Sequence, residues 1–467
     1  MSKFATAAKK AANLTTTENG AKTFISTNSK VLDFFYHAPV SRDNQVKVLS
    51  LFMDAFAENQ GLALKALFNL RDIRGGKGER QSFITCMNWL YSYHQIVYEN
   101  LIPYVPEYGC FRDFLKFHDA TPLKELIKDM MQGKDIGLAA KWLPSVNSGI
   151  ASKDAAKGLL KSLDISEIAY RKALSKARKD LNLVESLMSK KQFKRIEYSK
   201  VPSLANNKYM TSFHKNDKVR YEAFIEGATK GEVKMNSSVL YPHDIWDKEG
   251  VGSQAMWNNL PKFAETEQNV LCMVDTSASM RTKVANSSAA SVARALGYFI
   301  SSQNKGAFKN LVLTFSASPK FLDLGNTIKE AKNVYDKNEI VQNTNLYAAF
   351  QLILSHALRN KVKEDEMPKF LIVLSDMEFD SCVDGVTNLK AAKEAYKAAG
   401  YKMPIIVFWN IDSKKVQTPA KNDAKNVILA SGYSGSVIEA ILNMKDITPL
   451  QAMLDILNSE RYAQIKA

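Results

Sequence analysis

The spacing of apolar residues divides the chain into two parts with different secondary structure. From about residue 45 to residue 245, apolar side chains recur every three or four positions, as at Leu64, Leu67 and Phe68, and this period is typical of amphipathic helices. Breaks in the pattern separate successive helices, which we expect to pack as antiparallel pairs in an α-helical repeat. The breaks lie at residues 74–78, 103–109 and 143–144.

After about residue 265 the pattern predicts a parallel sheet. Short, continuously apolar runs alternate with helical patterns, and such runs are typical of strands that helices cover on both faces, as in a doubly wound α/β domain. The runs lie at residues 270–274, 311–315, 370–374, 405–409 and 427–430. The predicted organisation is an N-terminal tail (1–28), a helical-repeat domain (29–250), a linker (251–265) and the α/β domain with a C-terminal helix (266–467).

The composition is that of an ordered protein. The chain has 467 residues, of which 46% are hydrophobic and 24% charged, close to the average for globular domains. No run of about 20 apolar residues occurs, and the first 20 residues contain no continuous apolar segment. We therefore expect no membrane span and no secretion by a standard signal peptide. Four scattered cysteines without a C-x-x-C pair indicate a reducing compartment, so we predict a cytoplasmic protein.

The positive charge is concentrated in one segment. Of the formal net charge of +15, residues 171–220 carry +10, whereas residues 271–467 carry +5. Lys and Arg neutralise phosphates, and the interleaved rings of Phe193, Tyr198, Tyr209 and Phe213 offer stacking surfaces for unpaired bases. This mixture predicts RNA binding without DNA specificity; the alternative is a solvated helical face whose aromatic rings point into the core. The basic candidates are Arg171, Lys172, Lys176, Arg178, Lys179, Lys190, Lys191, Lys194, Arg195 and Lys200.

A glycine-rich turn at residues 74–78 is a second basic candidate. It lacks the G-x-x-x-x-G-K-[ST] spacing and follows a helix, so we do not expect an ATP site. The favoured interpretation is a tight turn between helices. The other is a turn that presents Arg71, Arg74 and Lys77 to RNA phosphates.

Polar side chains follow the predicted strands at one edge of the sheet. Asp275, Ser277 and Ser279 follow the first strand, Asp376 follows the strand at 370–374, and Thr344 precedes a helix between them. Because the carboxyl ends of parallel strands meet, these hard oxygen ligands suit Mg²⁺ or Mn²⁺, with water completing an octahedron. A carboxylate from a partner protein could fill an open position. The alternative is that the hydroxyl groups only cap helices.

Two resemblances to known families rest on these residues. The D-x-S-x-S string at 275–279, followed by Thr344 and Asp376, resembles the metal-ion-dependent adhesion site of the von Willebrand factor A domain. That resemblance implies that the two serines and the threonine contact the metal directly and that both aspartates act largely through water. Asn345 stands where the family often has Asp.

The helical half resembles the TROVE domain of the Ro autoantigen ribonucleoproteins at residues 70–80, 106–113 and 138–144. A related viral and cellular family, which joins a TROVE-like region to a von Willebrand A domain, is more similar still; it also has counterparts of residues 198–203 and 375–380. The resemblance covers about residues 30–465. It implies a HEAT-like ring of paired helices, closed by the A domain, that binds small noncoding or misfolded RNA on a basic outer surface.

We therefore expect a non-enzymatic RNA-binding scaffold with a metal-binding A domain that closes the ring or binds a partner. The six histidines form no obvious acid–base cluster, and no G-x-S-x-G motif is present. The competing hypothesis is a protein-interaction or assembly component, such as a viral one, that uses the metal site and binds RNA incidentally.

Overall fold

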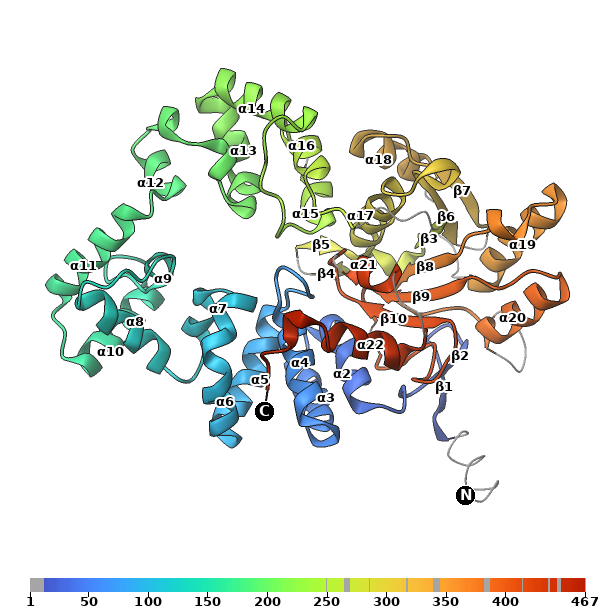
Figure 1. The fold of residues 1–467 in the computed structure, drawn as a ribbon, viewed down its shortest axis with the longest axis horizontal. Helices are drawn as coiled ribbons and strands as arrows, with labels where there is room; N and C mark the ends of the chain where they lie inside the picture. The colour runs from blue at the N-terminus through green and yellow to red at the C-terminus, as the bar shows by residue number, and fades with distance from the viewer. Residues whose placement is uncertain are drawn as a thin grey trace.

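The computed structural model describes residues 12–248, 250–263, 269–284, 286–315, 318–338, 345–381, 387–413, 415–435, 437–442 and 447–466. The N-terminal half is helical and the C-terminal half is an α/β domain, as the hydrophobic pattern predicts. The helices run in an arc that begins beside the sheet domain, bends away from it and returns to it (Figure 1). None of the described helices is long and apolar enough to cross a membrane.

The first arm of the arc spans residues 30–180 and has its own hydrophobic core. Successive helices reverse sharply at polar caps. For example, α3 (Gln45–Glu58) ends at Asn59, whose side chain accepts a hydrogen bond from Leu62 N at the start of α4 (Gln60–Arg71), at 3.0 Å. The other helices are α2 (Lys30–His37), α5 (Arg80–Tyr93), α6 (Gln95–Leu101), α7 (Val105–Tyr108), α8 (Thr121–Met131), α9 (Ala139–Trp142), α10 (Ile150–Leu163) and α11 (Glu167–Asp180).

The second arm spans residues 203–258. A joint at residues 181–202, which contains α12 (Val184–Ser189), connects it to the first arm. The apolar side chains of the second arm belong to the same core as one face of the sheet, so this arm is packed directly onto the sheet domain. Its helices are α13 (Ser203–Asn216), α14 (Lys218–Lys230), α15 (Pro242–Trp246) and α16 (Ser253–Asn258).

The sheet domain contains six hydrogen-bonded strands in the order β10-β9-β8-β3-β6-β7. The five predicted strands are present and parallel. A sixth, β7, pairs antiparallel with β6 at the edge, and the sequence pattern did not reveal it. The strands are β3 (Val270–Asp275), β6 (Leu311–Phe315), β7 (Lys320–Asp323), β8 (Phe370–Ser375), β9 (Ile405–Asn410) and β10 (Val427–Ser431).

Helices cover both faces of this sheet, which confirms the doubly wound prediction. One face packs against α17 (Ala289–Ser302), and the other packs against α19 (Leu346–Asn360) and α20 (Asn388–Ala398). Shorter or peripheral helices complete the domain: α18 (Ile328–Lys337), α21 (Val437–Leu442) and α22 (Pro449–Leu457). The carboxyl ends of the parallel strands face the junction with the helical arms, because residues of the β10 end contact the turn after α4.

Residues 12–28, the described part of the N-terminal tail expected at 1–28, form a structured segment. Strands β1 (Leu14–Thr16) and β2 (Lys22–Phe24) form a hairpin that lies on the sheet domain. Thr17 Oγ1 donates to Phe379 O at 2.6 Å, and Glu18 N donates to the Glu378 carboxylate at 2.7 Å. These long-range contacts leave no trace in a local sequence pattern.

The other predicted boundaries also differ. Residues 251–263, expected as linker, contain α16 and bury Trp257, Leu260 and Phe263 in the core shared with the sheet. At the other end of the chain, Met453 and Leu457 of α22 lie in the core of the first arm, not in that of the α/β domain. The C-terminal segment therefore returns to the helical half and links the first arm to the sheet domain.

A buried carboxylate anchors this C-terminal segment. Asp72, at the turn after α4, is fully buried and accepts a hydrogen bond from Arg461 Nη2 at 2.6 Å and another from Tyr462 Oη at 3.0 Å. Asn69 Nδ2 also donates to Tyr462 Oη at 3.0 Å. Because removing the partner of a buried charge leaves it unsolvated, this cluster fixes where the C-terminus lies.

We expect Arg461→Ala to lower the free energy of unfolding by about 3 kcal/mol, because Asp72 then stays buried without its counter-charge. Urea denaturation followed by circular dichroism measures the change. The matched control is Lys466→Ala, which removes an exposed cation from the same segment. Equal effects of the two substitutions would show that the Asp72 cluster does not hold the C-terminal segment.

Candidate functional site

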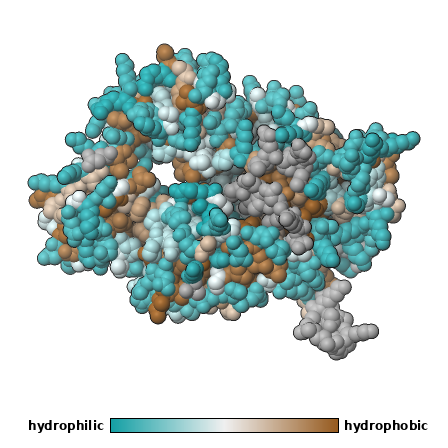
Figure 2. Space-filling view, in the orientation of Figure 1, coloured by the Kyte–Doolittle hydropathy of each residue, from teal (hydrophilic) through white to brown (hydrophobic). Residues whose placement is uncertain are grey.

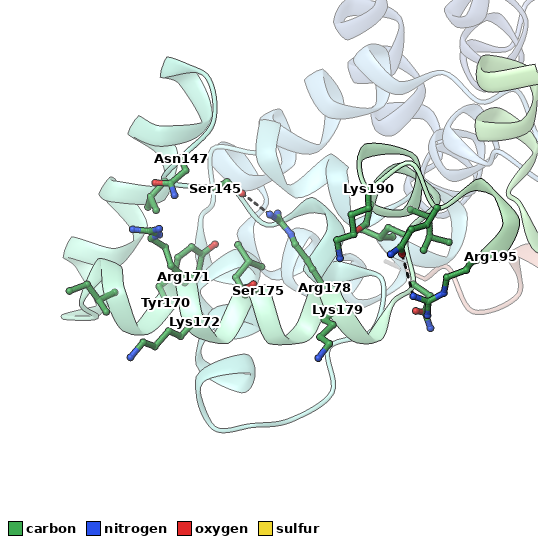
Figure 3. A pocket seen from close by; sticks show the side chains of 18 residues that line it. Ser145, Asn147, Tyr170, Arg171, Lys172, Ser175, Arg178, Lys179, Lys190 and Arg195 are labelled. Atoms are coloured by element: carbon green, nitrogen blue, oxygen red, sulfur yellow. Dashed lines mark hydrogen bonds between the residues drawn. The ribbon is translucent and has the colours of Figure 1, made fainter. Parts of the chain in front are cut away.

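The predicted basic segment forms one wall of a groove of about 890 Å³ between α11 and α12 (Figure 3). Residues 145–147, between α9 and α10, form the opposite wall. None of the described side chains that line the groove carries a carboxylate. The cations that line it are Arg171, Lys172, Arg178, Lys179, Lys190 and Arg195.

Apolar side chains line the groove between the cations. Val146 and Leu174 are buried, Leu183 and Leu187 are half-buried, and Ile168 is 67% exposed. The sequence analysis did not identify this apolar lining. Ile168, an apolar residue in the first turn of α11, could have indicated it. The groove can therefore contact both charged and uncharged parts of a ligand.

Two of the arginines are held by the opposite wall. Arg178 donates from Nε to Ala140 O (2.9 Å), from Nη2 to Leu143 O (2.7 Å) and from Nη1 to Ser145 Oγ (2.7 Å). Arg171 lies with Nε and Nη2 3.2 and 3.1 Å from the side-chain amide of Asn147. Arg178 thus holds α11 against α9 and the residues that follow it. Its expected role as a ligand contact is corrected to a structural one.

The groove lies at the joint, where the arc is thinnest. The core of the first arm extends to Leu174 and the core of the second begins at Ile196, and no described side chain between these two residues is buried. Asn182 and Lys191, on either side of α12, have positive φ angles of 45° and 55°. In the view of Figure 2 the surface of the molecule is mostly hydrophilic, and it is hollowed between the two arms.

The remaining basic candidates lie beside the groove or on the surface near it. Lys176, Lys191, Lys194 and Lys200 are exposed, and Lys200 Nζ forms an ion pair with Glu197 at 2.7 Å. The expected stacking rings are not all available. Tyr198 and Phe213 are buried in the core, while Phe193 and Tyr209 are half-buried, so the alternative that the aromatic residues point into the core holds for the first two.

Two of the three basic candidates at the glycine-rich turn have structural roles. Arg71 is buried and pairs with Asp113 at 2.7 Å. Lys77 is buried, lies 3.7 Å from the centre of the Phe35 ring, and donates to Phe35 O and to Ser431 Oγ. These side chains cannot meet an external phosphate, so the expectation for them was wrong. Arg74 is exposed.

The predicted metal residues lie at the carboxyl ends of β3 and β8. Asp275 is fully buried; its Oδ1 accepts from Ser277 N at 2.9 Å and its Oδ2 accepts from Ser375 Oγ at 2.6 Å. The hydroxyl oxygens of Ser277 and Ser279 are 2.9 Å apart. Burial and the negative charge of Asp376 raise the pKa of Asp275 to about 7, which reflects two carboxylates held close together in a dry site.

These side chains form an oxygen-only donor set. Among the described residues, no three His, Cys, Asp or Glu side chains are close enough together to hold a metal ion. The predicted set, however, has only two carboxylates and depends on hydroxyl oxygens. Thr344 lies outside the described residues, and Asn345 caps α19 by accepting from Ala348 N at 2.7 Å. The described groups fit a hard divalent cation, which would relieve the repulsion between Asp275 and Asp376.

Comparison with known proteins identifies two family models of unknown function. Domain of unknown function 7788 matches residues 269–464, and domain of unknown function 2828 matches residues 17–117 and 160–287. A protein of Acanthamoeba polyphaga mimivirus, described as uncharacterized, is 28% identical over 96% of this chain and 87% of that protein. The crystal structure of the Ro (RSR) protein of Deinococcus radiodurans aligns with 91% of this chain and 93% of that chain at 13% identity. Its TM-score of 0.35 does not establish a shared fold.

The buried Lys77 generates a pH-dependent prediction. Burial lowers its pKa from 10.5 to about 7, so the folded state binds fewer protons than the unfolded state between pH 7 and pH 10.5. Stability from this group therefore rises with pH in that window, and we expect the wild type to gain about 2 kcal/mol between pH 7 and pH 9 relative to Lys77→Met. Urea unfolding at several pH values measures this difference. Lys116→Met, at an exposed position, should keep the wild-type profile; a parallel profile for Lys77→Met would contradict the prediction.

Proposed function

We propose that the protein is a non-catalytic RNA-binding scaffold whose principal contact is the groove at the joint. The observation that carries the proposal is the groove lining, which has six cations and no described carboxylate. Such a surface attracts a polyanion, because each Lys or Arg that meets a phosphate releases condensed counterions. The TROVE-like strings in the helical half support the same function.

The ligand that fits this groove best is an unpaired RNA segment. Val146, Leu183 and Leu187 line the space between the cations, and apolar walls gain from contact with the flat faces of bases. In a duplex those faces are stacked inside the helix and only the phosphate backbone is presented. A small noncoding or misfolded RNA supplies such unpaired segments at loops and ends.

The sheet domain would supply a divalent metal site at the ends of β3 and β8. Asp275, Ser277, Ser279, Thr344 and Asp376 would hold Mg²⁺ or Mn²⁺, which supplies positive charge at an otherwise acidic edge. The support is the oxygen-only donor set, the burial of both aspartates and the resemblance to the von Willebrand A domain. This metal would help to hold a partner at the edge of the sheet domain.

Reversing four groove charges, Lys172→Glu, Lys179→Glu, Lys190→Glu and Arg195→Glu, should weaken binding of a single-stranded RNA of about 12 nucleotides by at least about 100-fold. With the wild type, log K should fall with log salt with a slope of about −3.5, as the five groove cations other than Arg178 imply for a single strand. Fluorescence anisotropy across a salt series measures both quantities.

The matched control reverses four exposed lysines elsewhere on the first arm: Lys116, Lys153, Lys157 and Lys161. It has the same net charge as the groove variant and should keep most of the affinity. If both variants lose affinity equally, the attraction is a general charge effect and not a property of the groove. Tighter binding of a duplex than of the single strand would exclude the unpaired-segment assignment.

The metal proposal predicts that Asp275→Asn with Asp376→Asn reduces Mn²⁺ affinity by more than about tenfold, because the negative ligand charge is lost while the side-chain shape is kept. Electron paramagnetic resonance of free Mn²⁺ measures binding directly. Asp323→Asn, on β7 at the far edge of the sheet, is the control. Unchanged Mn²⁺ affinity in the double variant would exclude this site.

A further inference from the structure

A second cavity lies where both arms of the arc meet the sheet domain. It has a volume of about 300 Å³ and is bounded by the turn after α4, the segments that precede α15 and follow α16, and the turn before α21. In Figure 1 these segments converge near the centre of the molecule. We refer to it as the seam pocket. It is separate from both the groove and the candidate metal edge.

The charge of the seam pocket comes from two exposed cations on different segments. Arg74 comes from the first arm and Lys262 from the segment after α16, and none of the described lining residues is acidic. Arg74 Nη1 donates to Glu107 O, which fixes the orientation of the guanidinium. Its Nε and Nη2 form no hydrogen bond with the described residues. A planar guanidinium with two unused donors matches the oxygens of a phosphate.

Two aromatic side chains also line the seam pocket. Phe263 and Phe299 line it with their ring centroids 6.3 Å apart and nearly perpendicular; both belong to the core, and each leaves less than a tenth of its surface exposed. Gly435 lies directly on Phe299, because a Cβ at this position would come within 2.6 Å of the ring. Any larger residue would displace the ring. This glycine therefore keeps the aromatic wall close to the sheet domain and leaves the pocket open.

Hydrogen bonds hold the segments around the pocket in place. Tyr241 Oη donates to Lys77 O at 3.0 Å, which joins the second arm to the glycine-rich turn. Phe263 N donates to Gln303 Oε1 at 3.0 Å, which fixes the segment after α16 to the end of α17. The Asp72–Arg461 pair lies behind Gly75. The pocket is thus built on anchored backbone, a condition for a defined ligand site.

We propose that the seam pocket binds a single nucleotide through its phosphate and its base. The phosphate lies between Arg74 and Lys262, and the base lies against the small exposed parts of Phe263 and Phe299. The volume is at the lower end of those known for small-molecule sites, so it accommodates one nucleotide and excludes a base-paired strand. The same chemistry is offered by a free mononucleotide and by the phosphorylated terminal nucleotide of an RNA.

Binding there would join three parts of the molecule. The first arm contributes Arg74, the segment after α16 contributes Lys262 and Phe263, and the sheet domain contributes Phe299 and Gly435. A ligand that contacts all three parts stabilises the closed arc. The gain in free energy grows with the logarithm of the ligand concentration relative to its dissociation constant. The site therefore couples nucleotide binding to the closure of the arc, independently of the RNA groove.

The test is isothermal titration of AMP and of adenosine into the full-length protein. We expect AMP to bind in the range of about 0.1–1 mM and to raise the melting temperature, and adenosine to bind at least about tenfold more weakly because it lacks the phosphate. Arg74→Ala with Lys262→Ala should lower AMP affinity by more than about tenfold. Lys309→Ala, which removes an exposed cation next to the pocket but outside it, should leave AMP binding unchanged.

A second pair of ligands distinguishes the two sources. A short RNA with a 5′-phosphate and the same RNA with a 5′-hydroxyl are titrated into the groove variant described above. Preference for the phosphorylated end, lost on Arg74→Ala with Lys262→Ala, assigns the pocket to RNA termini; AMP binding without that preference assigns it to free nucleotides. No AMP binding by the wild type and no end preference, or equal binding by wild type and pocket variant, would overturn the proposal.

Discussion

The arrangement of the molecule depends on satisfying the buried carboxylate of Asp72. It lies at the turn where the first arm meets the sheet domain, and its partners Arg461 and Tyr462 are 389 and 390 residues away in the chain. A carboxylate buried without such partners costs several kcal/mol, so the C-terminal segment must return to the first arm. That return brings β10 and the turn after it against Lys77, and the arc of helices is thereby closed on the sheet domain.

In the closed arrangement of the arc, the cationic groove and the buried aspartates lie in different parts of the molecule. The cations that form the groove lie at the joint, far along the arc from the sheet, while Asp275 and Asp376 lie buried at the strand ends. Placing these groups apart avoids mutual neutralisation, because charges separated by more than a Debye length of about 10 Å act independently in salt. The proposed polyanion contact and the proposed cation contact are therefore separate sites on one frame. The seam pocket lies at the closure itself and is built from all three parts of the chain.

Local charge was a good guide to the basic surface and a poor guide to individual residues. Residues of the segment at 171–220 do line a cationic groove. Arg178, however, donates its hydrogen bonds to the backbone oxygens of Ala140 and Leu143 and is not available to a ligand. Arg71 and Lys77, which stand in an equally basic string, are buried. Whether a guanidinium or ammonium group faces solvent depends on neighbours such as Asp113 and Phe35, which come from other helices, and no spacing rule predicts those contacts.

The sequence by itself determined the elements: the helical period, the five parallel strands and the polar residues at the strand ends follow from local side-chain pattern, since burial on one or two faces dictates the period. Only the tertiary structure decided that the N-terminal segment is a hairpin on the sheet, that the supposed linker is core, and that α22 packs on the first arm. These features are long-range pairings, in which short segments gain stability only from surfaces supplied elsewhere in the chain. The seam pocket belongs to the same class, because each of its walls is unremarkable in sequence and becomes a site only where three distant segments meet.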